Sequence, residues 1–146
     1  MSLAVAFKAL AAERMAEEMP LVEVALRLDV DVSTVSHYLR GDYPSEDARD
    51  AAAEILKEVP PFSLWAWLSR ELGENVAVEV LKWLADWEAE VLRDEERCIL
   101  CGRCTDRCRF DGCVGCGECV RACPVNAREL IVESDRYRFR MSPSDR

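Results

Sequence analysis

The stretch Cys98–Pro124, CILCGRCTDRCRFDGCVGCGECVRACP, contains all eight cysteines of the 146-residue chain. They form two copies of the pattern C-x2-C-x2-C-x3-C, and the second copy begins 15 residues after the first. The first copy consists of Cys98, Cys101, Cys104 and Cys108, and the second of Cys113, Cys116, Cys119 and Cys123. Disulfides do not require such regular spacing, whereas a metal centre does, because three thiolates must converge from one tight loop. The pattern therefore predicts that the eight cysteines are metal ligands.

Closely spaced thiolates select soft metals, namely iron–sulfur clusters, zinc or copper(I). The C-x2-C pairs alone would fit zinc, for example Cys98 and Cys101 together with Cys113 and Cys116. Two further features favour iron–sulfur clusters: each motif has a third cysteine after two residues and a fourth after three, and Pro124 follows the second motif. We therefore expect iron–sulfur chemistry in this segment.

The segment CVGCGECVRACPVNA closely resembles the cluster-binding loop of bacterial-type ferredoxins. This resemblance implies two [4Fe–4S] clusters in a ferredoxin-like domain, with the fourth cysteine of each motif binding the other cluster. The implied ligand sets are Cys98, Cys101, Cys104 and Cys123 for one cluster, and Cys113, Cys116, Cys119 and Cys108 for the other. The first motif departs from the family, because Arg109 replaces the usual proline and only Arg109–Gly112 separates the motifs. One [4Fe–4S] cluster plus zinc, or two locally ligated clusters, remain as alternatives.

The net charge of −9 is unevenly distributed along the chain. Residues 1–60 carry 6 basic and 12 acidic side chains, residues 61–96 carry 3 and 9, and residues 97–146 carry 10 and 7. The acidity argues against unspecific polyanion binding by the N-terminal part and leaves local, geometrically placed contacts open. No apolar run approaches the roughly 20 residues of a membrane-spanning helix. The N-terminus has no signal-peptide pattern, and cysteines at metal-ligand spacing are typical of a reducing compartment, so a cytoplasmic location is expected.

The apolar periodicity predicts a mainly α-helical N-terminal domain. The resemblance to bacterial-type ferredoxins implies that a small α+β ferredoxin-like iron–sulfur domain follows it. The expected segments are a helical domain at 1–60, a tryptophan-rich helical connector at 61–96 and the cluster domain at 97–146. Helices are expected at about 3–18, 20–28, 32–40, 46–59 and 63–72, and the longest at 76–96. The tail 128–141 is expected to form one or two strands, because apolar and charged residues alternate there.

The segment Val24–Gly41, VALRLDVDVSTVSHYLRG, resembles the helix-turn-helix of the phage-repressor (Cro-like, XRE) family. Asp29 stands where that family prefers glycine, and aspartate tolerates the left-handed backbone region that the turn requires. The resemblance implies that the start of the third helix enters the major groove of duplex DNA. The implied base-facing residues are Val32, Ser33, Thr34, Ser36 and His37, with Arg27 and Arg40 as phosphate partners. Short three-helix units also serve as protein-docking modules, and this alternative stays open.

All four tryptophans, Trp65, Trp67, Trp83 and Trp87, fall within residues 61–96. Such an aromatic-rich stretch is typical of a packed core or of an interface between two copies of the chain. Core packing and homodimerisation are therefore both expected interpretations of these residues.

The sequence offers no nucleophile–base pair, no phosphate-binding P-loop and no Rossmann glycine pattern, so we do not expect an enzyme. The leading hypothesis is a transcriptional regulator that binds DNA through the helix-turn-helix and senses redox or cluster state through two [4Fe–4S] clusters. The alternative is a ferredoxin-type electron-transfer protein whose helical domain docks a redox partner. A third interpretation makes the metal a structural element only.

Overall fold

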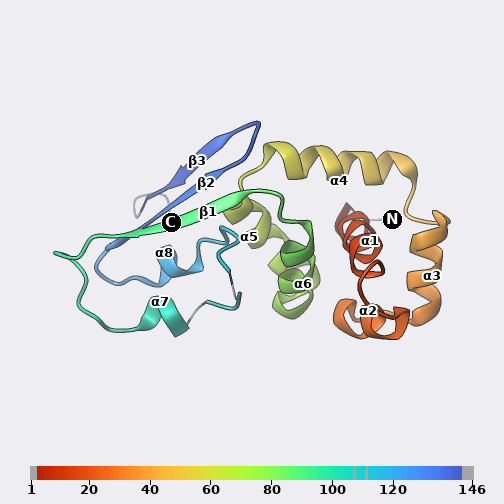
Figure 1. Ribbon diagram of the computed structural model, residues 1–146, viewed down its shortest axis with the longest axis horizontal. Helices are drawn as coiled ribbons and strands as arrows, with labels where there is room; N and C mark the ends of the chain where they lie inside the picture. Colours follow the sequence, from red (N-terminus) through yellow and green to blue (C-terminus); the bar gives the residue numbers. More distant parts are fainter. Residues whose placement is uncertain (1–2, 107, 111, 143–146) are drawn as a thin grey trace. The chain divides into compact units, whose positions relative to one another are not determined.

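The computed structural model describes residues 3–106, 108–110 and 112–142 of the chain. It divides into two compact units, each of which is formed by two separate stretches of chain (Figure 1). We call residues 1–58 and 65–85 the helical unit, and residues 59–64 and 86–146 the cysteine unit. Within the described residues, no helix combines the length and apolar character needed to cross a membrane.

The helical unit is arranged around its first helix. Its elements are α1 (Leu3–Met15), α2 (Leu21–Leu28), α3 (Val32–Arg40), α4 (Glu46–Glu58), α6 (Glu74–Leu84) and the greater part of α5 (Pro61–Leu72). Helix α1 packs against α2, α3, α4 and α6. It is buried on several sides, and five of its buried residues are alanines: Ala4, Ala6, Ala9, Ala11 and Ala12. These small side chains allow the neighbouring helices to approach closely, while Phe7 and Met15 fill the larger spaces.

Helices α2 and α3 occur where the sequence predicts them, and a short turn joins them. Asp29 adopts the left-handed conformation, with φ 56°, and the Val30 N–H donates to the Ala25 carbonyl at 3.0 Å. Helix α3 ends at Arg40, and Gly41 caps it with a φ of 77° that suits glycine. Val35 and Tyr38 face the interior of the unit. The two helices are thus confirmed, while their membership of the repressor family remains a prediction.

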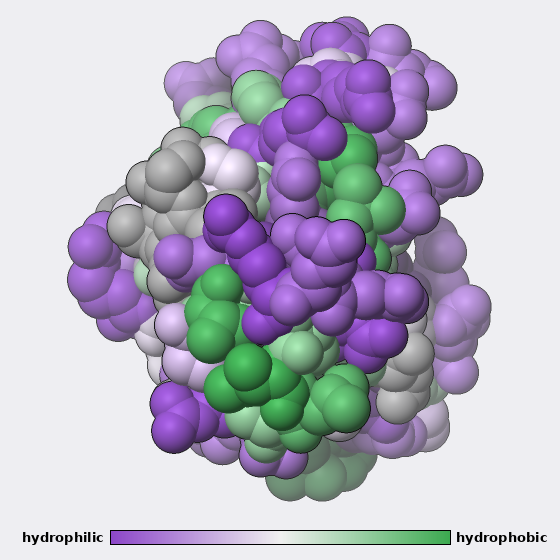
Figure 2. All heavy atoms as spheres, turned by 90° about the vertical axis from the view of Figure 1, so that its left-hand side faces the viewer, coloured by the Kyte–Doolittle hydropathy of each residue, from purple (hydrophilic) through white to green (hydrophobic). Residues whose placement is uncertain are grey.

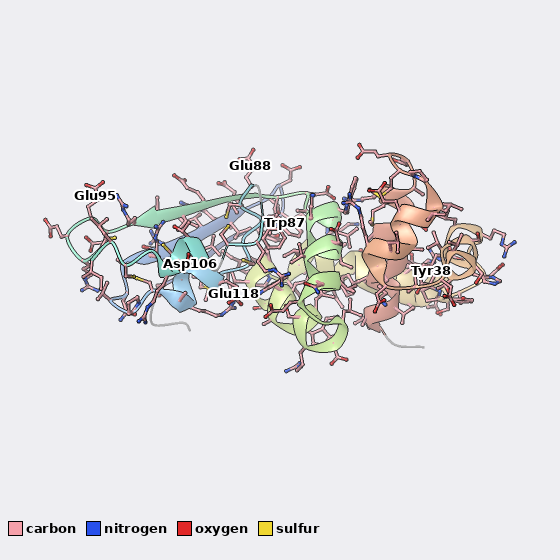
Figure 3. The ribbon with its side chains drawn as sticks, turned by 90° about the horizontal axis from the view of Figure 1, so that it is seen from below. Tyr38, Trp87, Glu88, Glu95, Asp106 and Glu118 are labelled. Carbon is pink, nitrogen blue, oxygen red and sulfur yellow. The ribbon has the colours of Figure 1, made fainter. Side chains whose placement is uncertain are left out.

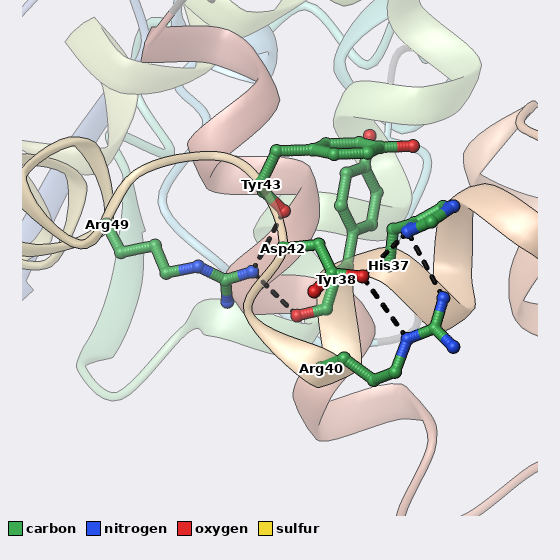
Figure 4. Close-up of polar contacts among 6 residues, drawn as sticks. All are labelled: His37, Tyr38, Arg40, Asp42, Tyr43 and Arg49. Atoms are coloured by element: carbon green, nitrogen blue, oxygen red, sulfur yellow. Dashed lines mark hydrogen bonds and ion pairs between the residues drawn. The ribbon is translucent and has the colours of Figure 1, made fainter.

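Arg49 of α4 fastens the loop that follows α3 (Figure 4). Its guanidinium donates to the carbonyl oxygens of Tyr38 at 2.6 Å and Tyr43 at 3.2 Å, and it forms an ion pair with Glu13 of α1. Because one rigid fork of donors satisfies carbonyls on two segments, it fixes α4 to both α1 and the end of α3.

The cysteine unit contains a three-stranded antiparallel sheet with the order β1-β2-β3. Its elements are β1 (Glu88–Arg93), α7 (Arg103–Asp106), α8 (Glu118–Ala122), β2 (Arg128–Glu133) and β3 (Arg138–Met141). Val91 lies opposite Leu130, and Leu130 lies opposite Met141, so these residues share one face. That face forms the core together with Val120 of α8 and Val132 of β2. The tail was expected to form one or two strands, and it forms two.

The predicted helix from Val76 to Glu96 is wrong beyond Leu84. Helix α6 ends there, and residues 88–93 form the strand β1 instead. The sequence after Ala85 alternates charged and apolar residues, and half-buried Ala89 and Val91 alternate with exposed Glu88 and Glu90. This period of two suits a strand with one face on a core, and it outweighs the helical spacing extrapolated from the preceding turns.

The tryptophans are divided between the two units. Trp65 is buried in the helical unit, and the Trp67 ring packs edge-on against Phe7 with 5.7 Å between ring centroids. Trp83 is half-buried in the same unit, whereas Trp87 packs against the core of the cysteine unit. Core packing therefore accounts for much of their surface, and homodimerisation stays a prediction.

Candidate metal centre

The two cysteine motifs repeat in backbone conformation as well as in spacing. Leu100 and Gly115 occupy the third position of each motif, with φ of 57° and 79°, and Gly102 and Gly117 occupy the fifth, with φ of 78° and 80°. After each pair of turns, a short helix begins: α7 carries Cys104 and α8 carries Cys119. These helices lie side by side, as Asp106 and Glu118 mark in Figure 3. Cysteines at matching positions of the two motifs are therefore held by turns of the same backbone conformation.

A first cavity, of about 160 Å³, lies at the loop of the first motif. The cysteines in its wall are Cys98, Cys101, Cys104 and Cys123. Three of them come from the first motif, and the fourth comes from the end of the second. Arg93 and Arg128 also line this cavity, as do the apolar residues Ile99 and Leu100 of the loop itself.

A second cavity, of about 320 Å³, lies between the second motif and the sheet. Its wall contains Cys108, Cys113, Cys116 and Cys119, and Cys104 is shared with the first cavity. Val91 of β1 and Leu130 of β2 provide an apolar side. Apart from the shared Cys104, the wall again combines three cysteines of one motif with the fourth cysteine of the other.

The donor chemistry of both cavities fits iron–sulfur clusters. Each wall offers four or more cysteine sulfurs and no histidine. Among the described residues, no three His, Cys, Asp or Glu side chains converge as they would around a single metal ion. In a multinuclear cluster the four ligands bind different iron atoms, so cysteines that line a cavity fit such a cluster.

Burial and hydrogen bonding affect the thiols of the second motif in different ways. Burial raises the pKa of Cys113 and Cys119, and it raises that of Cys116 to about 11. Burial would also raise the pKa of Cys123, but backbone N–H groups, first that of Ala127, together hold it below its usual value. The Ala127 N–H donates to Cys123 Sγ at 3.2 Å. Metal binding at the other three positions must therefore displace protons at neutral pH.

The second motif is built into the core of the cysteine unit. A Cβ at Gly115 would lie 2.8 Å from Val132 Cγ2, and one at Gly117 would lie 2.6 Å from Met141 Sδ. The Trp87 indole N–H donates to the Val114 carbonyl at 2.7 Å. Arg121 of α8 donates to the carbonyls of Cys116 and Phe62, both at 3.0 Å. The CVGC loop is thus held by the sheet, by Trp87 and by the first turn of α5.

The first motif is more open to solvent. A Cβ at Gly102 would meet no atom within 4 Å, and α7 buries none of its residues. Ile99 and Leu100 are 60% and 81% exposed. Figure 2, which faces this end of the cysteine unit, shows hydrophobic side chains gathered among hydrophilic ones. Of the link between the motifs, Asp111 lies outside the described residues, as does Arg107 before Cys108.

The residues predicted to contact DNA lie on α2 and α3 of the helical unit. Val32, Ser33 and Arg40 are exposed, while Thr34, Ser36, His37 and Arg27 are half-buried. Arg27 forms ion pairs with Glu23 at 2.8 Å and with Glu79 at 3.5 Å. Asp42 accepts from His37 Nδ1 at 2.8 Å and pairs with Arg40 at 3.3 Å (Figure 4). Both arginines proposed as phosphate partners therefore already have carboxylate partners.

Sequence reasoning missed several residues of the two cavities, above all Arg128, Arg93 and Val91. It placed residues 91–93 in a helix, so their position beside the cysteines was hidden. Arg128 carried a signal, since it is the charged residue directly after the otherwise uncharged segment CPVNA.

Comparisons with known proteins agree with this geometry. Two family models, each described as a 4Fe–4S binding domain, match residues 95–111 and 109–129. They confirm the predicted 4Fe–4S motifs, and neither supports the zinc alternative or extends into the helical unit. No solved structure matches the chain.

Two curated relatives resemble the chain. The Ferredoxin-type protein FwdE of Methanocaldococcus jannaschii is 32% identical over 127 residues, which cover 76% of this chain and 82% of that protein. The archaeal-type glutamate synthase (NADPH) of Dehalococcoides mccartyi is 35% identical over 66 residues, which cover 34% of this chain but 13% of that protein. The first match spans most of both proteins, so the chain belongs to the family of ferredoxin-type iron–sulfur proteins.

Proposed function

We propose that this protein transfers electrons between protein partners through two [4Fe–4S] clusters. In this proposal Cys98, Cys101, Cys104 and Cys123 hold the first cluster, and Cys108, Cys113, Cys116 and Cys119 hold the second. The supporting observation is that Cys123 lines the first cavity with three cysteines of the first motif, and Cys108 lines the second cavity with three cysteines of the second motif and the shared Cys104. This is the crossed arrangement expected for two-cluster ferredoxins.

Electron transfer suits the site better than catalysis. A bound [4Fe–4S] cluster supplies a one-electron redox couple. Both motifs are complete, so each iron atom has a cysteine ligand and none is left open to a substrate. The single histidine of the chain, His37, lies in the helical unit and is hydrogen-bonded to Asp42. In this proposal the protein supplies the clusters with cysteine ligands, nearby charged side chains and shielding from water.

The helical unit is the proposed docking module for a redox partner. It carries 8 basic and 15 acidic side chains, whereas the cysteine unit carries 11 and 13. Such an excess of carboxylates favours a partner with a basic surface and accelerates its association. We expect this association to weaken as salt increases, because exposed charges are screened.

The test begins with anaerobic purification or reconstitution of the full chain. Two clusters correspond to about eight iron atoms and about eight sulfides per chain, with an EPR signal that appears on reduction and disappears on reoxidation. Zinc, or iron that cannot be reduced reversibly, would contradict the proposal. The ligation is tested by single serine substitutions: crossed ligation predicts that Cys123→Ser leaves the same EPR signal as Cys101→Ser, whereas local ligation predicts the signal left by Cys116→Ser.

DNA binding by a cytoplasmic regulator is the second candidate. The observation in its favour is that Val32 and Ser33, at the start of α3, are exposed while Val35 and Tyr38 are buried, as a groove-reading helix requires. The ion pairs of Arg27 and Arg40 favour the docking role instead, because DNA would have to displace Glu23, Glu79 and Asp42. Binding to duplex DNA in an electrophoretic assay at low salt, dependent on cluster state and lost in Ser33→Glu, would favour regulation. No binding in any cluster state would leave the docking role.

A further inference from the structure

Arg128 occupies a special position between the two cysteine-lined cavities. It is the first residue of β2 and follows Cys123 by five positions. Among the described residues, it is the charged side chain that lines both cavities; Arg93 lines the first alone, and Glu118 the second alone. The residue is half-buried, so water screens its charge less than that of an exposed arginine.

The guanidinium of Arg128 makes a direct contact with one proposed ligand. Its Nη2 donates to Cys104 Sγ at 3.0 Å. Here the sulfur is that of a free cysteine, and as an iron ligand it would be a thiolate, which is a stronger acceptor. Arg128 also lines the second cavity, together with Cys108, Cys113, Cys116 and Cys119. It therefore lies beside cysteines assigned to both clusters.

The sheet register adds an independent observation. Arg93 of β1 and Arg128 of β2 lie directly opposite each other, and both line the first cavity. Like charges at directly opposed positions destabilise an antiparallel pair. Arg93 has a partial counterion in Glu95 at 3.5 Å. A negatively charged group in the cavity would offset the remaining repulsion, and a cluster held by four thiolates is such a group.

We propose that Arg128 raises the reduction potentials of both clusters, and that of the first cluster more strongly because of its hydrogen bond to Cys104. Reduction adds one electron, and so one negative charge, to a cluster. A nearby permanent cation and an N–H donor to a ligand sulfur both stabilise the reduced state more than the oxidised state. This inference rests on the proposed function, since it takes the two clusters and their crossed ligands as given.

The experiment measures the potentials of both clusters in the full-length, anaerobically reconstituted chain by EPR-monitored redox titration. Arg128→Met removes charge and donor, Arg128→Lys keeps the charge without the rigid fork, and Arg138→Met is the matched control. Arg138 is exposed on β3 of the same sheet and lines neither cavity. Cys101→Ser removes a ligand of the first cluster and Cys116→Ser a ligand of the second, so the potential that remains in each variant belongs to the other cluster. Iron and sulfide analysis shows whether the arginine variants retain both clusters.

We expect Arg128→Met to shift both potentials to more negative values. For the first cluster the expected change is at least tenfold in the reduction equilibrium, or about 59 mV for one electron. Arg128→Lys should leave the potential of the second cluster near its value in the unmodified chain. It should place the potential of the first cluster between the values for the unmodified chain and for Arg128→Met. Arg138→Met should shift neither potential as far as Arg128→Met does.

Three results would overturn the inference. Unchanged potentials in a fully loaded Arg128→Met variant would do so, as would equal shifts in Arg138→Met. If the Arg128→Met variant does not hold both clusters, the Arg128→Lys variant provides the test. The inference is then overturned if the first cluster of Arg128→Lys has the same potential as in the unmodified chain. Failure of the unmodified chain to bind [4Fe–4S] clusters would overturn the proposed function as well, so the two failures are distinguishable.

Discussion

The first and second cysteine motifs share their spacing and backbone turns but have different surroundings. Gly115 and Gly117 are buried against Val132 and Met141, whereas their counterparts Leu100 and Gly102 are exposed. The second motif therefore depends on the core of the cysteine unit, and the core depends on it in return. The first motif depends mainly on its own turns and on the metal it is expected to hold. The same ligand pattern is thus part of the packed core in the second motif and exposed to solvent in the first.

The largest expected difference comes from removing equivalent ligands. Cys116→Ser and Cys101→Ser should each lower the iron content from about eight to about four atoms per chain. Cys116→Ser should also lower the unfolding midpoint of the cysteine unit strongly, because Cys116 lies in the loop packed on the core and metal binding supplies folding energy. Iron analysis with thermal unfolding followed by circular dichroism measures both effects. Equal midpoints for the two variants would contradict the comparison.

The glycines provide a second contrast at matched positions. Gly117→Ala should destabilise the cysteine unit by about 2–4 kcal/mol, because it combines left-handed strain with a clash against Met141. Gly102→Ala should cost about 1–2 kcal/mol, since it has the same backbone strain but open space around it. Anaerobic denaturant titration of the loaded chain gives the two free energies of unfolding. A Gly102→Ala variant as unstable as Gly117→Ala would show that the first motif is packed as tightly as the second.

Trp87 sharpens the comparison further, because its indole bonds to the second motif. Trp87→Phe keeps a ring in the core but leaves the Val114 carbonyl without this donor, and should cost about 1–2 kcal/mol. The EPR signal of the second cluster, observed alone in the Cys101→Ser background, should be lost faster on exposure to air. Trp67→Phe in the helical unit is the control, and it should leave that rate unchanged.

The smallest expected effect is a gain in stability. Leu100 adopts a positive φ, which costs a residue with a side chain about 1–2 kcal/mol. Glycine would relieve this strain, but its greater loss of chain entropy on folding offsets about 0.5–1 kcal/mol of the gain. Leu100→Gly should therefore stabilise the cysteine unit by up to about 1 kcal/mol, with little loss of burial because Leu100 is 81% exposed. The same denaturant titration measures it. A clear loss of stability would mean that the Leu100 side chain packs on the cluster loop.

Much of this molecule could be predicted from sequence because its strongest signals are local. Cysteine spacing indicated the 4Fe–4S motifs, and Asp29 and Gly41 indicated where α2 and α3 end. The strand β1 could not be found in this way, because its partner residues in β2 follow 35 or more positions later. Its short alternation of charged and apolar residues also directly follows the helical pattern of α6, which predicts that the helix continues. The sites of Arg93 and Arg128 depend on that pairing, so they were hidden with it.

The path of the chain has a consequence for any attempt to divide this protein. Residues 59–64 belong to the cysteine unit, although residues on both sides of them belong to the helical unit. Pro61 and Phe62 lie against the positions of Gly115 and Gly117. A fragment that begins at residue 86 would keep every cysteine but lose these two side chains, and no single cut would release both units whole. The two units are interleaved along the chain, so a cut after residue 85 leaves residues 59–64 of the cysteine unit on the helical fragment.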